Sequence, residues 1–191
     1  MSPDDLCVEQ LATHPELFEQ VGILRWKEWA YGEPDPARFV DVTREESGDG
    51  ARLPMTLVAV DTTHKAIGVV GLGPIDDEVS DTERSGRTPW ILGMVVAKEA
   101  RRRGTGRLLL TALQRAAAGL GYQQTWVATG KEAVGFYQRC GWEPVEHLRL
   151  ESTGVRRRSC ANRRALPLMP VKDRLTKGLR ALRTGERSRG R

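Results

Sequence analysis

Three arginines and two glycines separate an apolar run from an amphipathic stretch in the middle of the chain. Residues 96–110 read VAKEARRRGTGRLLL. Gly104 and Gly106 let the backbone turn sharply and approach a ligand without an intervening Cβ, so that successive N–H groups can point at an anion. A helix that begins here adds unpaired N–H donors and the positive end of its dipole. The pattern therefore predicts a site for a phosphate or pyrophosphate group.

Two common phosphate-binding loops do not match this segment. A Walker A loop requires Gly-Lys-Ser/Thr at the end of a longer loop, and a dinucleotide-binding fingerprint requires a small residue where this chain has Leu109. The pattern R/Q-x-x-G-x-G/A does match, at Arg101, Gly104 and Gly106. Further along the chain, residues 133–142 read AVGFYQRCGW, which is similar to A-x-x-F-Y-x-x-x-G-F with a tryptophan as the last aromatic residue.

On these two segments, which with the preceding apolar run cover residues 90–145, the chain resembles the GNAT superfamily of acetyl-CoA-dependent N-acetyltransferases. The resemblance implies that residues 101–107 hold the coenzyme pyrophosphate and that residues 94–96 line the pantetheine arm. It also implies that Tyr137 meets the coenzyme sulfur as the catalytic residue. The residues implied in acetyl-CoA binding are Met94, Val95, Val96, Arg101, Arg102, Arg103, Gly104, Thr105, Gly106, Arg107 and Phe136.

The aromatic pair in the second segment has a preferred orientation. On a short helix, Phe136 is expected to face the core, and Tyr137, the next residue along the helix, is expected to point toward the coenzyme cleft. Gly141 follows where a helix C-terminus favours a residue with positive φ. A tyrosine with a pKa near ~10 is a weaker acid than a thiol near ~8.5, so full proton transfer to a thiolate is uphill by roughly 2 kcal/mol. We therefore expect the hydrogen bond from Tyr137 to matter more than its proton.

The general base is not assigned by the sequence. Many superfamily members carry a glutamate on the strand that corresponds to residues 90–96, and this chain has no carboxylate there. An alkyl amine with a pKa near ~10.4 must still lose a proton, at about 4 to 5 kcal/mol at pH 7. The candidates are a water chain, the carboxylates Glu28, Glu33, Asp76 and Asp77, and the histidines His14, His64 and His147, which have no partner placed by the sequence.

The acceptor amine would bind on the other side of the coenzyme. Trp26 and Trp29 lie three residues apart on one face of a predicted helix, where they either wall an acceptor pocket or pack in the core. An acidic segment follows residue 72 and can attract a positively charged substrate. The candidate substrate-contacting residues are Trp26, Trp29, Glu28 and Asp76.

Charge is distributed unevenly along the 191 residues, whose net charge is +5. Residues 1–150 contain 17 basic and 22 acidic side chains, for a net charge of −5, whereas residues 151–191 contain 13 and 3, for a net charge of +10. The acidic part favours a small cationic amine such as an aminoglycoside or a polyamine. A protein or peptide acceptor docked by the basic end is an alternative, and a catalytically silent acyl-CoA-binding module is a second. No recognition-helix signature supports a nucleic-acid partner.

The cysteine and hydropathy patterns bear on metal sites, disulfide bonds and the cellular compartment. Cys7, Cys140 and Cys160 have no metal-ligand spacing, so neither a metal site nor a disulfide framework is expected. The chain has no long apolar segment, and acidic residues stand near its start where a signal peptide would be basic. These features predict a cytoplasmic protein that does not use a membrane. They do not indicate an oligomeric state.

The elements that position these residues follow from periodicity and turn signals. The sequence predicts a domain over residues 1–166 and a basic, flexible tail over residues 167–191. The domain is expected to be α/β, with a mixed sheet of about six to seven strands and helices on both faces, because a strand–helix–strand unit at 90–129 is flanked by hairpins. Helices are predicted at 15–31, 37–46, 103–120 and around Tyr137, and strands at 55–60, 66–72, 90–96, 125–129, 145–150 and 158–166.

Overall fold

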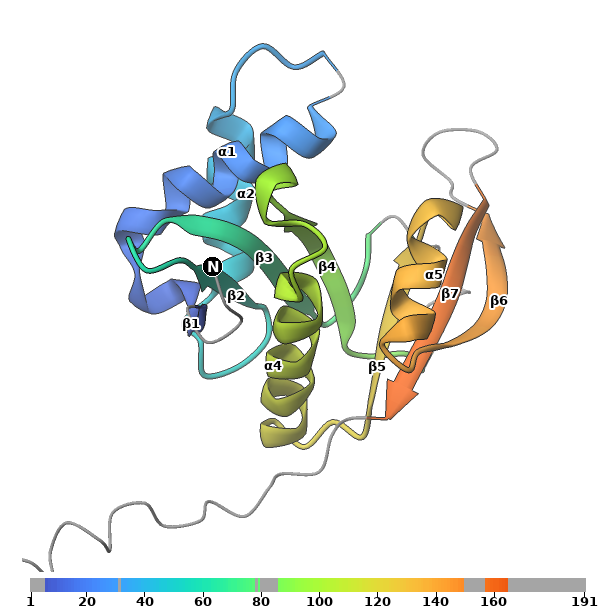
Figure 1. The fold of residues 1–191 in the computed structure, drawn as a ribbon. Coiled ribbons are helices and arrows are strands. Elements are labelled where there is room, and N and C mark those ends of the chain that lie inside the picture. Colours follow the sequence, from blue (N-terminus) through green and yellow to red (C-terminus); the bar gives the residue numbers. More distant parts are fainter. Residues whose placement is uncertain (1–5, 31, 78, 80–85, 150–156, 165–191) are drawn as a thin grey trace, which may run out of the picture.

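The computed structural model describes residues 6–30, 32–77, 79, 86–149 and 157–164. Helices and strands are mixed along the chain (Figure 1). They are β1 (Cys7–Gln10), α1 (Phe18–Trp29), α2 (Ala37–Ser47), β2 (Met55–Val60), β3 (Ala66–Gly73), β4 (Trp90–Val96), α4 (Thr105–Gly119), β5 (Gln124–Thr129), α5 (Lys131–Arg139), β6 (Glu143–Arg149) and β7 (Arg157–Arg164). Short 3-10 turns occupy Leu11–Thr13, Pro15–Leu17 and Lys98–Ala100.

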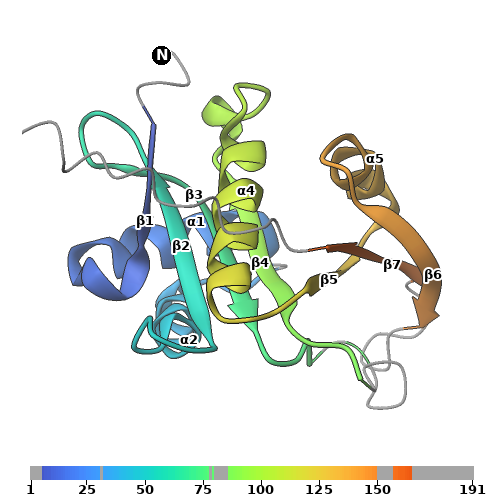
Figure 2. The same ribbon diagram turned by 90° about the horizontal axis from the view of Figure 1, so that it is seen from below.

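A seven-stranded mixed sheet organises these elements, in the order β1-β2-β3-β4-β5-β7-β6. Every neighbouring pair is antiparallel except β4 and β5, which are parallel and are connected through α4. Helices α1 and α2 cover one face, and α4 and α5 lie on the other (Figure 2). The expected α/β fold with a mixed sheet and helices on both faces is therefore confirmed.

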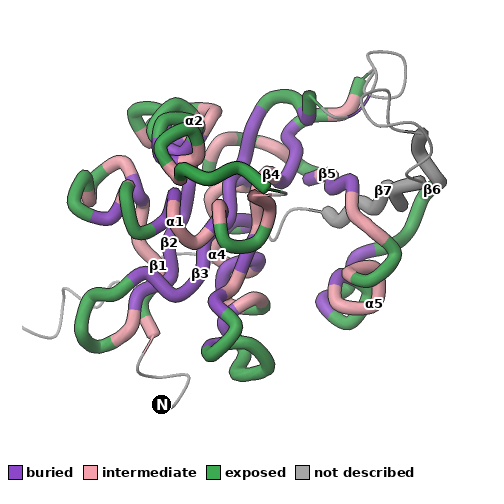
Figure 3. Tube along the Cα trace, turned by 90° about the horizontal axis from the view of Figure 1, so that it is seen from above, coloured by how far each residue is buried: buried purple, intermediate pink, exposed green. Residues whose placement is uncertain are grey.

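The sheet divides the hydrophobic core into two main clusters, one on each of its faces. Leu57 and Ala59 of β2 pack in a cluster that includes the apolar side of α4. Val58 and Val60, which alternate with them, pack with Val21 of α1. All six residues of β2 and all eight of β3 are buried, because helices cover both sides of these strands (Figure 3).

The structure differs from the sequence predictions at several boundaries. The strand β1 was not predicted, and it lies at one edge of the sheet, paired antiparallel with β2. The first helix begins at Phe18 rather than Pro15, since Pro15–Leu17 form a 3-10 turn. The last strand, β7, inserts between β5 and β6. The predicted tail at 167–191 lies outside the described residues, and among the residues that are described no helix is long and apolar enough to cross a membrane.

Candidate active site

The parallel strands β4 and β5 meet only at their beginning. Their register contains one Cα pair, Trp90 and Trp126, and the N–H of Trp126 donates to the carbonyl of Pro89 at 2.9 Å. Beyond this point the two strands diverge (Figures 1 and 2). The edge of β4 that faces β5 therefore has no strand partner after Trp90 within the described part of the sheet. Its backbone N–H and C=O groups are available to hydrogen-bond an extended ligand.

A β-bulge lies in the diverging part of β4. Val69 pairs with Val95 and Gly71 pairs with Leu92, so Val70 stands opposite both Gly93 and Met94. Gly93 has a φ of +49°, and a Cβ on it would lie 3.0 Å from a guanidinium nitrogen of Arg25. Bulges of this kind re-aim side chains and are frequent next to active sites. The bulge alters the direction of β4 where Met94 approaches α5.

The segment between β4 and α4, residues 97–104, is named here the phosphate turn. Arg102 and Gly104 both have positive φ, +62° and +88°. Gly104 is the N-cap residue of α4, and it makes no side-chain capping bond. A Cβ on residue 104 would meet no atom within 4 Å, so a side chain would fit here. Glycine is favoured at this position because of the positive φ. As a glycine, Gly104 also has no side chain that could cap the first N–H groups of α4, and an anion can accept hydrogen bonds from such groups.

Gly106 is required for a different reason. A Cβ at this position would lie 3.0 Å from Cζ of Phe136 and 3.5 Å from Cε of Met94. The first turn of α4 thus packs closely against α5 and β4 at the place where β4 and β5 have separated. Three predicted coenzyme residues, Met94, Gly106 and Phe136, are brought together here by contacts between different elements.

Tyr137 is buried in this same region, with 6% of its surface exposed. Its hydroxyl donates to Sδ of Met94 at 3.6 Å, and its ring lies 5.5 Å from the ring of Trp142. Burial, with a smaller contribution from the charge of Cys140, raises the pKa of Tyr137 well above its ordinary value. The hydroxyl is therefore held on the β4 side of α5 as a neutral hydrogen-bond donor.

The expectation that Phe136, rather than Tyr137, faces the core was wrong. Tyr137 is the buried residue of α5, whereas Phe136 is only partly buried against the first turn of α4. The side of α5 that faces β4 and Trp142 is the more enclosed side, and the tyrosine lies on it. The hydroxyl nevertheless reaches β4, because it is directed at Met94.

The predicted phosphate-binding arginines are engaged to different extents. Arg101 donates through Nε to the carbonyl of Val96 at 2.8 Å, and its Nη2 lies 2.7 Å from Oε2 of Glu28. Arg107 donates to the carbonyl of Arg139, at the end of α5, at 2.9 Å. Arg102 and Arg103 are exposed. Thr105, also predicted to bind the coenzyme, is buried and donates through Oγ1 to the carbonyl of Ala100.

The side chain of Val95 does not line the diverging strands. It is buried in the core cluster on the α1 face, whereas its neighbours Met94 and Val96 contact the cluster on the α4 face. The expectation that all three line the pantetheine arm is therefore corrected for the Val95 side chain. Alternation along a strand sends every second side chain to the opposite face.

The predicted acceptor residues fall into two groups. Trp26, Glu28 and Trp29 lie together at the end of α1, and the Glu28–Arg101 ion pair joins this end to the phosphate turn. Trp26 donates to the carbonyl of Glu33 at 2.9 Å, and Trp29 packs against the core on the α1 face. Asp76 is not brought to them. It is buried in the segment that follows β3, at the end of the sheet where β4 begins.

A buried arginine was missed by the sequence analysis. Arg25 of α1 is 3% exposed and forms an ion pair with Oε2 of Glu46 at 2.7 Å, and Nη1 also donates to Oγ1 of Thr43. Burial lowers the pKa of its guanidinium, and Glu46 opposes that shift. Arg25 stands four residues after Val21, on the apolar face of α1. The signal that could have revealed it is a charged residue at a position where the helical pattern of α1 calls for an apolar one.

Comparison with known families agrees with this geometry. The sequence profile of the Acetyltransferase (GNAT) family matches residues 19–142, a span that includes the phosphate turn, α5 and all of α1 except for its first residue. The chain belongs to the GNAT acetyltransferase family. A search of curated protein sequences finds no significant match for this GNAT acetyltransferase.

Solved structures share its fold at low sequence identity. An aminoglycoside 6'-N-acetyltransferase complexed with coenzyme A aligns with a TM-score of 0.66 and 16% identity, over 84% of this chain and 98% of that one. A spermidine N-acetyltransferase from Vibrio cholerae aligns with a TM-score of 0.60 and 18% identity, over 85% and 95%. A GNAT-family protein described as a possible acetyltransferase, from Desulfovibrio desulfuricans, aligns with a TM-score of 0.62 and 14% identity, over 84% and 99%.

Proposed function

We propose that this GNAT acetyltransferase moves the acetyl group of acetyl-CoA onto the primary amine of a small cationic acceptor of the aminoglycoside or polyamine type. The observation that carries the proposal is the divergence of β4 from β5 after a single paired position, below the uncapped start of α4. This arrangement offers hydrogen bonds to an extended amide chain and, at its end, donors for a pyrophosphate.

The residues present fit acetyl-CoA. The pyrophosphate would lie at the phosphate turn, where Gly104 has no side chain and the exposed Arg102 and Arg103 add positive charge. The pantetheine amides would bond to the backbone edge of β4 between Leu92 and Val96. Acetyl-CoA supplies the acetyl group as a thioester. Met94 and Tyr137 would hold that thioester.

Tyr137 is proposed to stabilise the departing thiolate through a hydrogen bond. Complete transfer of its proton is unfavourable by roughly 2 kcal/mol for an ordinary tyrosine and thiol. Burial raises the pKa of Tyr137 further, so transfer is less favourable still in this protein. The same burial excludes water from the hydroxyl, which strengthens a hydrogen bond to a charged sulfur. The hydroxyl therefore acts as a fixed donor.

The acceptor is proposed to enter beside the end of α1. Glu28 is the predicted carboxylate that lies next to the phosphate turn, and its Oε2 is ion-paired with Arg101. We infer that it attracts the protonated amine and does not remove its proton. The amine then loses this proton to water, its nitrogen bonds to the thioester carbonyl carbon, and the carbon–sulfur bond breaks to release the thiolate. The acceptor class is supported by the net charge of −5 over residues 1–150 and by two structural neighbours, an aminoglycoside and a spermidine acetyltransferase.

Release of coenzyme A thiol tests this proposal. The full chain with acetyl-CoA should turn over aminoglycosides or polyamines faster than amino acids and peptides, measured against the rate of acetyl-CoA hydrolysis alone. Since charge attraction contributes, kcat/KM for these acceptors should fall as ionic strength rises. Turnover confined to peptides would replace the acceptor class with a protein substrate. Tight acetyl-CoA binding with no turnover of any amine would favour a silent coenzyme-binding module.

A further inference from the structure

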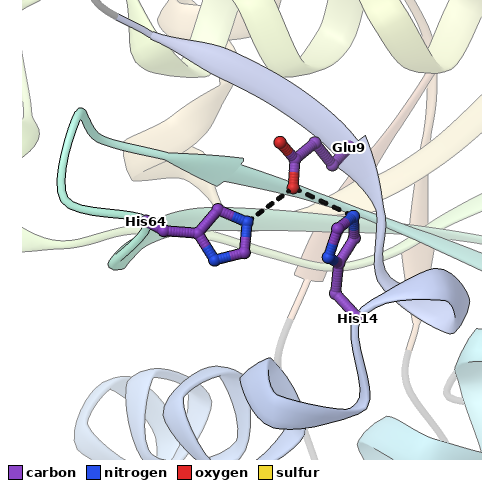
Figure 4. Close-up of side chains that lie close together, drawn as sticks. All are labelled: Glu9, His14 and His64. Carbon is purple, nitrogen blue, oxygen red and sulfur yellow. Dashed lines mark hydrogen bonds and ion pairs between the residues drawn. The ribbon is translucent and has the colours of Figure 1, made fainter.

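Three side chains from separate segments converge at the edge of the sheet opposite to β6 (Figure 4). Glu9 comes from β1, His14 follows the 3-10 turn after β1, and His64 comes from the turn between β2 and β3. Their possible ligand atoms all lie within 4.8 Å of one another. This edge is three strands away from β4, so the cluster is separate from the proposed acetyltransferase site.

The geometry of the cluster suits a single metal ion. Both histidines direct Nε2 at the same oxygen, Oε2 of Glu9, at 3.1 Å from His14 and 3.0 Å from His64 (Figure 4). Ligands bonded to zinc at about 2.0–2.1 Å in a tetrahedron lie about 3.3 Å from one another. The separations from the carboxylate oxygen are close to this value. A small movement of the side chains would therefore admit an ion between them.

A second carboxylate lies behind the two imidazole rings. Oε1 of Glu16 is 3.2 Å from Nδ1 of His14 and 3.9 Å from Nδ1 of His64. The pKa of Glu16 is held below its ordinary value, mainly by a backbone hydrogen bond and also by His14. Histidines that bind metal through one nitrogen usually donate the other N–H to a carboxylate, which fixes the tautomer and the ring orientation. Glu16 occupies that position for His14, whereas its distance from His64 is too long for a hydrogen bond.

The backbone holds His64 in place before any ion binds. His64 has a φ of +60°, in the left-handed region, which non-glycine residues adopt uncommonly and in which asparagine, aspartate and histidine are enriched. Oδ1 of Asp61 accepts hydrogen bonds from the N–H of Thr63 at 2.9 Å and of Lys65 at 3.1 Å, on either side of His64. The turn is thus constrained on both sides of the histidine. Residues kept in sparsely populated conformations concentrate at functional sites.

We propose that Glu9, His14 and His64 bind a divalent transition-metal ion of the zinc type, with water in the fourth position. Imidazole and carboxylate ligands suit zinc, and all three side chains are partly exposed, so that water reaches the ion. The ion would join β1 and its following turn to the β2–β3 hairpin. The other titratable groups that face the site are Glu16 and Cys7, the latter with a pKa raised by burial and by Glu9.

Calorimetric titration of the full chain with zinc chloride tests the proposal. We expect one ion per chain and an increase in the thermal unfolding temperature on addition of zinc. His14→Gln and His64→Asn should lower the affinity more than a hundredfold, and asparagine is chosen because it tolerates the left-handed conformation. Glu16→Gln should lower it ten- to a hundredfold, as expected of a group that orients the ligands.

Two control variants complete the experiment. His147→Gln removes the remaining histidine, which lies on β6 at the other end of the sheet, and should leave zinc affinity unchanged. Cys7→Ser should also leave it unchanged, since the thiol is not one of the ligands. Circular dichroism in the absence of zinc verifies that each variant folds. Acetyl transfer should be insensitive to chelation, which distinguishes this site from the proposed active site.

Three results would overturn the proposal. One is wild-type protein that binds no zinc at millimolar concentration. Another is binding that persists with full affinity in His14→Gln and His64→Asn. The third is binding that disappears in Cys7→Ser but survives in the histidine variants, because it would place the ion on the thiol instead.

Discussion

Replacement of Tyr137 by phenylalanine tests the proposed role of its hydroxyl most directly. In the structure this hydroxyl donates to the thioether sulfur of Met94 at 3.6 Å, a weak interaction whose loss should lower the free energy of unfolding by less than about 1 kcal/mol. The ring contacts are retained. A hydrogen bond to a charged group contributes about 1.5–3 kcal/mol, and each 1.36 kcal/mol changes a rate tenfold. We therefore expect kcat to fall about 10- to 150-fold.

The assay follows thiol release at saturating amine, with single-turnover measurements to establish that chemistry limits the rate. Acetyl-CoA affinity should be unchanged in Tyr137→Phe, since the interaction strengthens only as negative charge develops on the sulfur. Tyr122→Phe is the matched control. Tyr122 follows the end of α4 and is partly buried against the same core cluster, so the variant loses the same atom away from β4. Its kcat should equal that of the wild type.

Unchanged kcat in Tyr137→Phe, with chemistry limiting, would assign the residue to packing alone. The pH dependence separates donation of a hydrogen bond from transfer of the proton. Because burial raises the pKa of Tyr137, its ionisation should not appear in the kcat profile below pH ~10. A basic limb present in the wild type and absent from the variant would refute the fixed-donor mechanism.

Three further predictions follow from other parts of the chain. At Gly106 a Cβ would lie 3.0 Å from an aromatic ring carbon on α5, so Gly106→Val should weaken acetyl-CoA binding at least tenfold in calorimetry. Gly104→Ala should weaken binding less, and should lower the free energy of unfolding by about 1 kcal/mol because residue 104 has a left-handed φ. Arg25→Ala breaks a buried ion pair and should lower the free energy of unfolding in urea by about 3 kcal/mol, part of which Glu46→Ala should restore in the double variant. Deletion of residues 167–191 should leave kcat/KM for a small amine unchanged. A loss that shrinks as the Debye length falls from about 30 to about 8 Å would favour an acidic protein acceptor instead.

The phosphate turn and the strands around it were predictable because their signals are local. Strands at 55–60 and 90–96 were predicted with the bounds that the structure shows, since a short apolar run between turn signals already specifies a buried strand. The close contact of Gly106 with Phe136 of α5 was not predictable in this way. The role of Gly104 in the sharp turn depends on neighbouring residues and on the missing Cβ. These features need no information about distant segments.

Strand β1 was not predicted because its four residues, CVEQ, carry little apolar periodicity. It is a strand because β2 offers it a hydrogen-bonding edge, a condition set by residues about fifty positions away. The orientation of Phe136 and Tyr137 was also decided outside the helix that carries them. Both rings are apolar enough to be buried, and the packing of α5 against β4 determined which one is.

Tertiary structure alone brought together the charged groups that the sequence left apart. Nothing in the spacing of Glu9, His14 and His64 indicates a cluster, because the hairpin that carries His64 reaches them only through the order of strands in the sheet. Likewise, Glu28 meets Arg101 because the end of α1 lies beside the phosphate turn. Local patterns report which backbone conformation a segment prefers. The distance between side chains far apart in the chain depends on how the sheet and its helices pack, and that is a property of the whole fold.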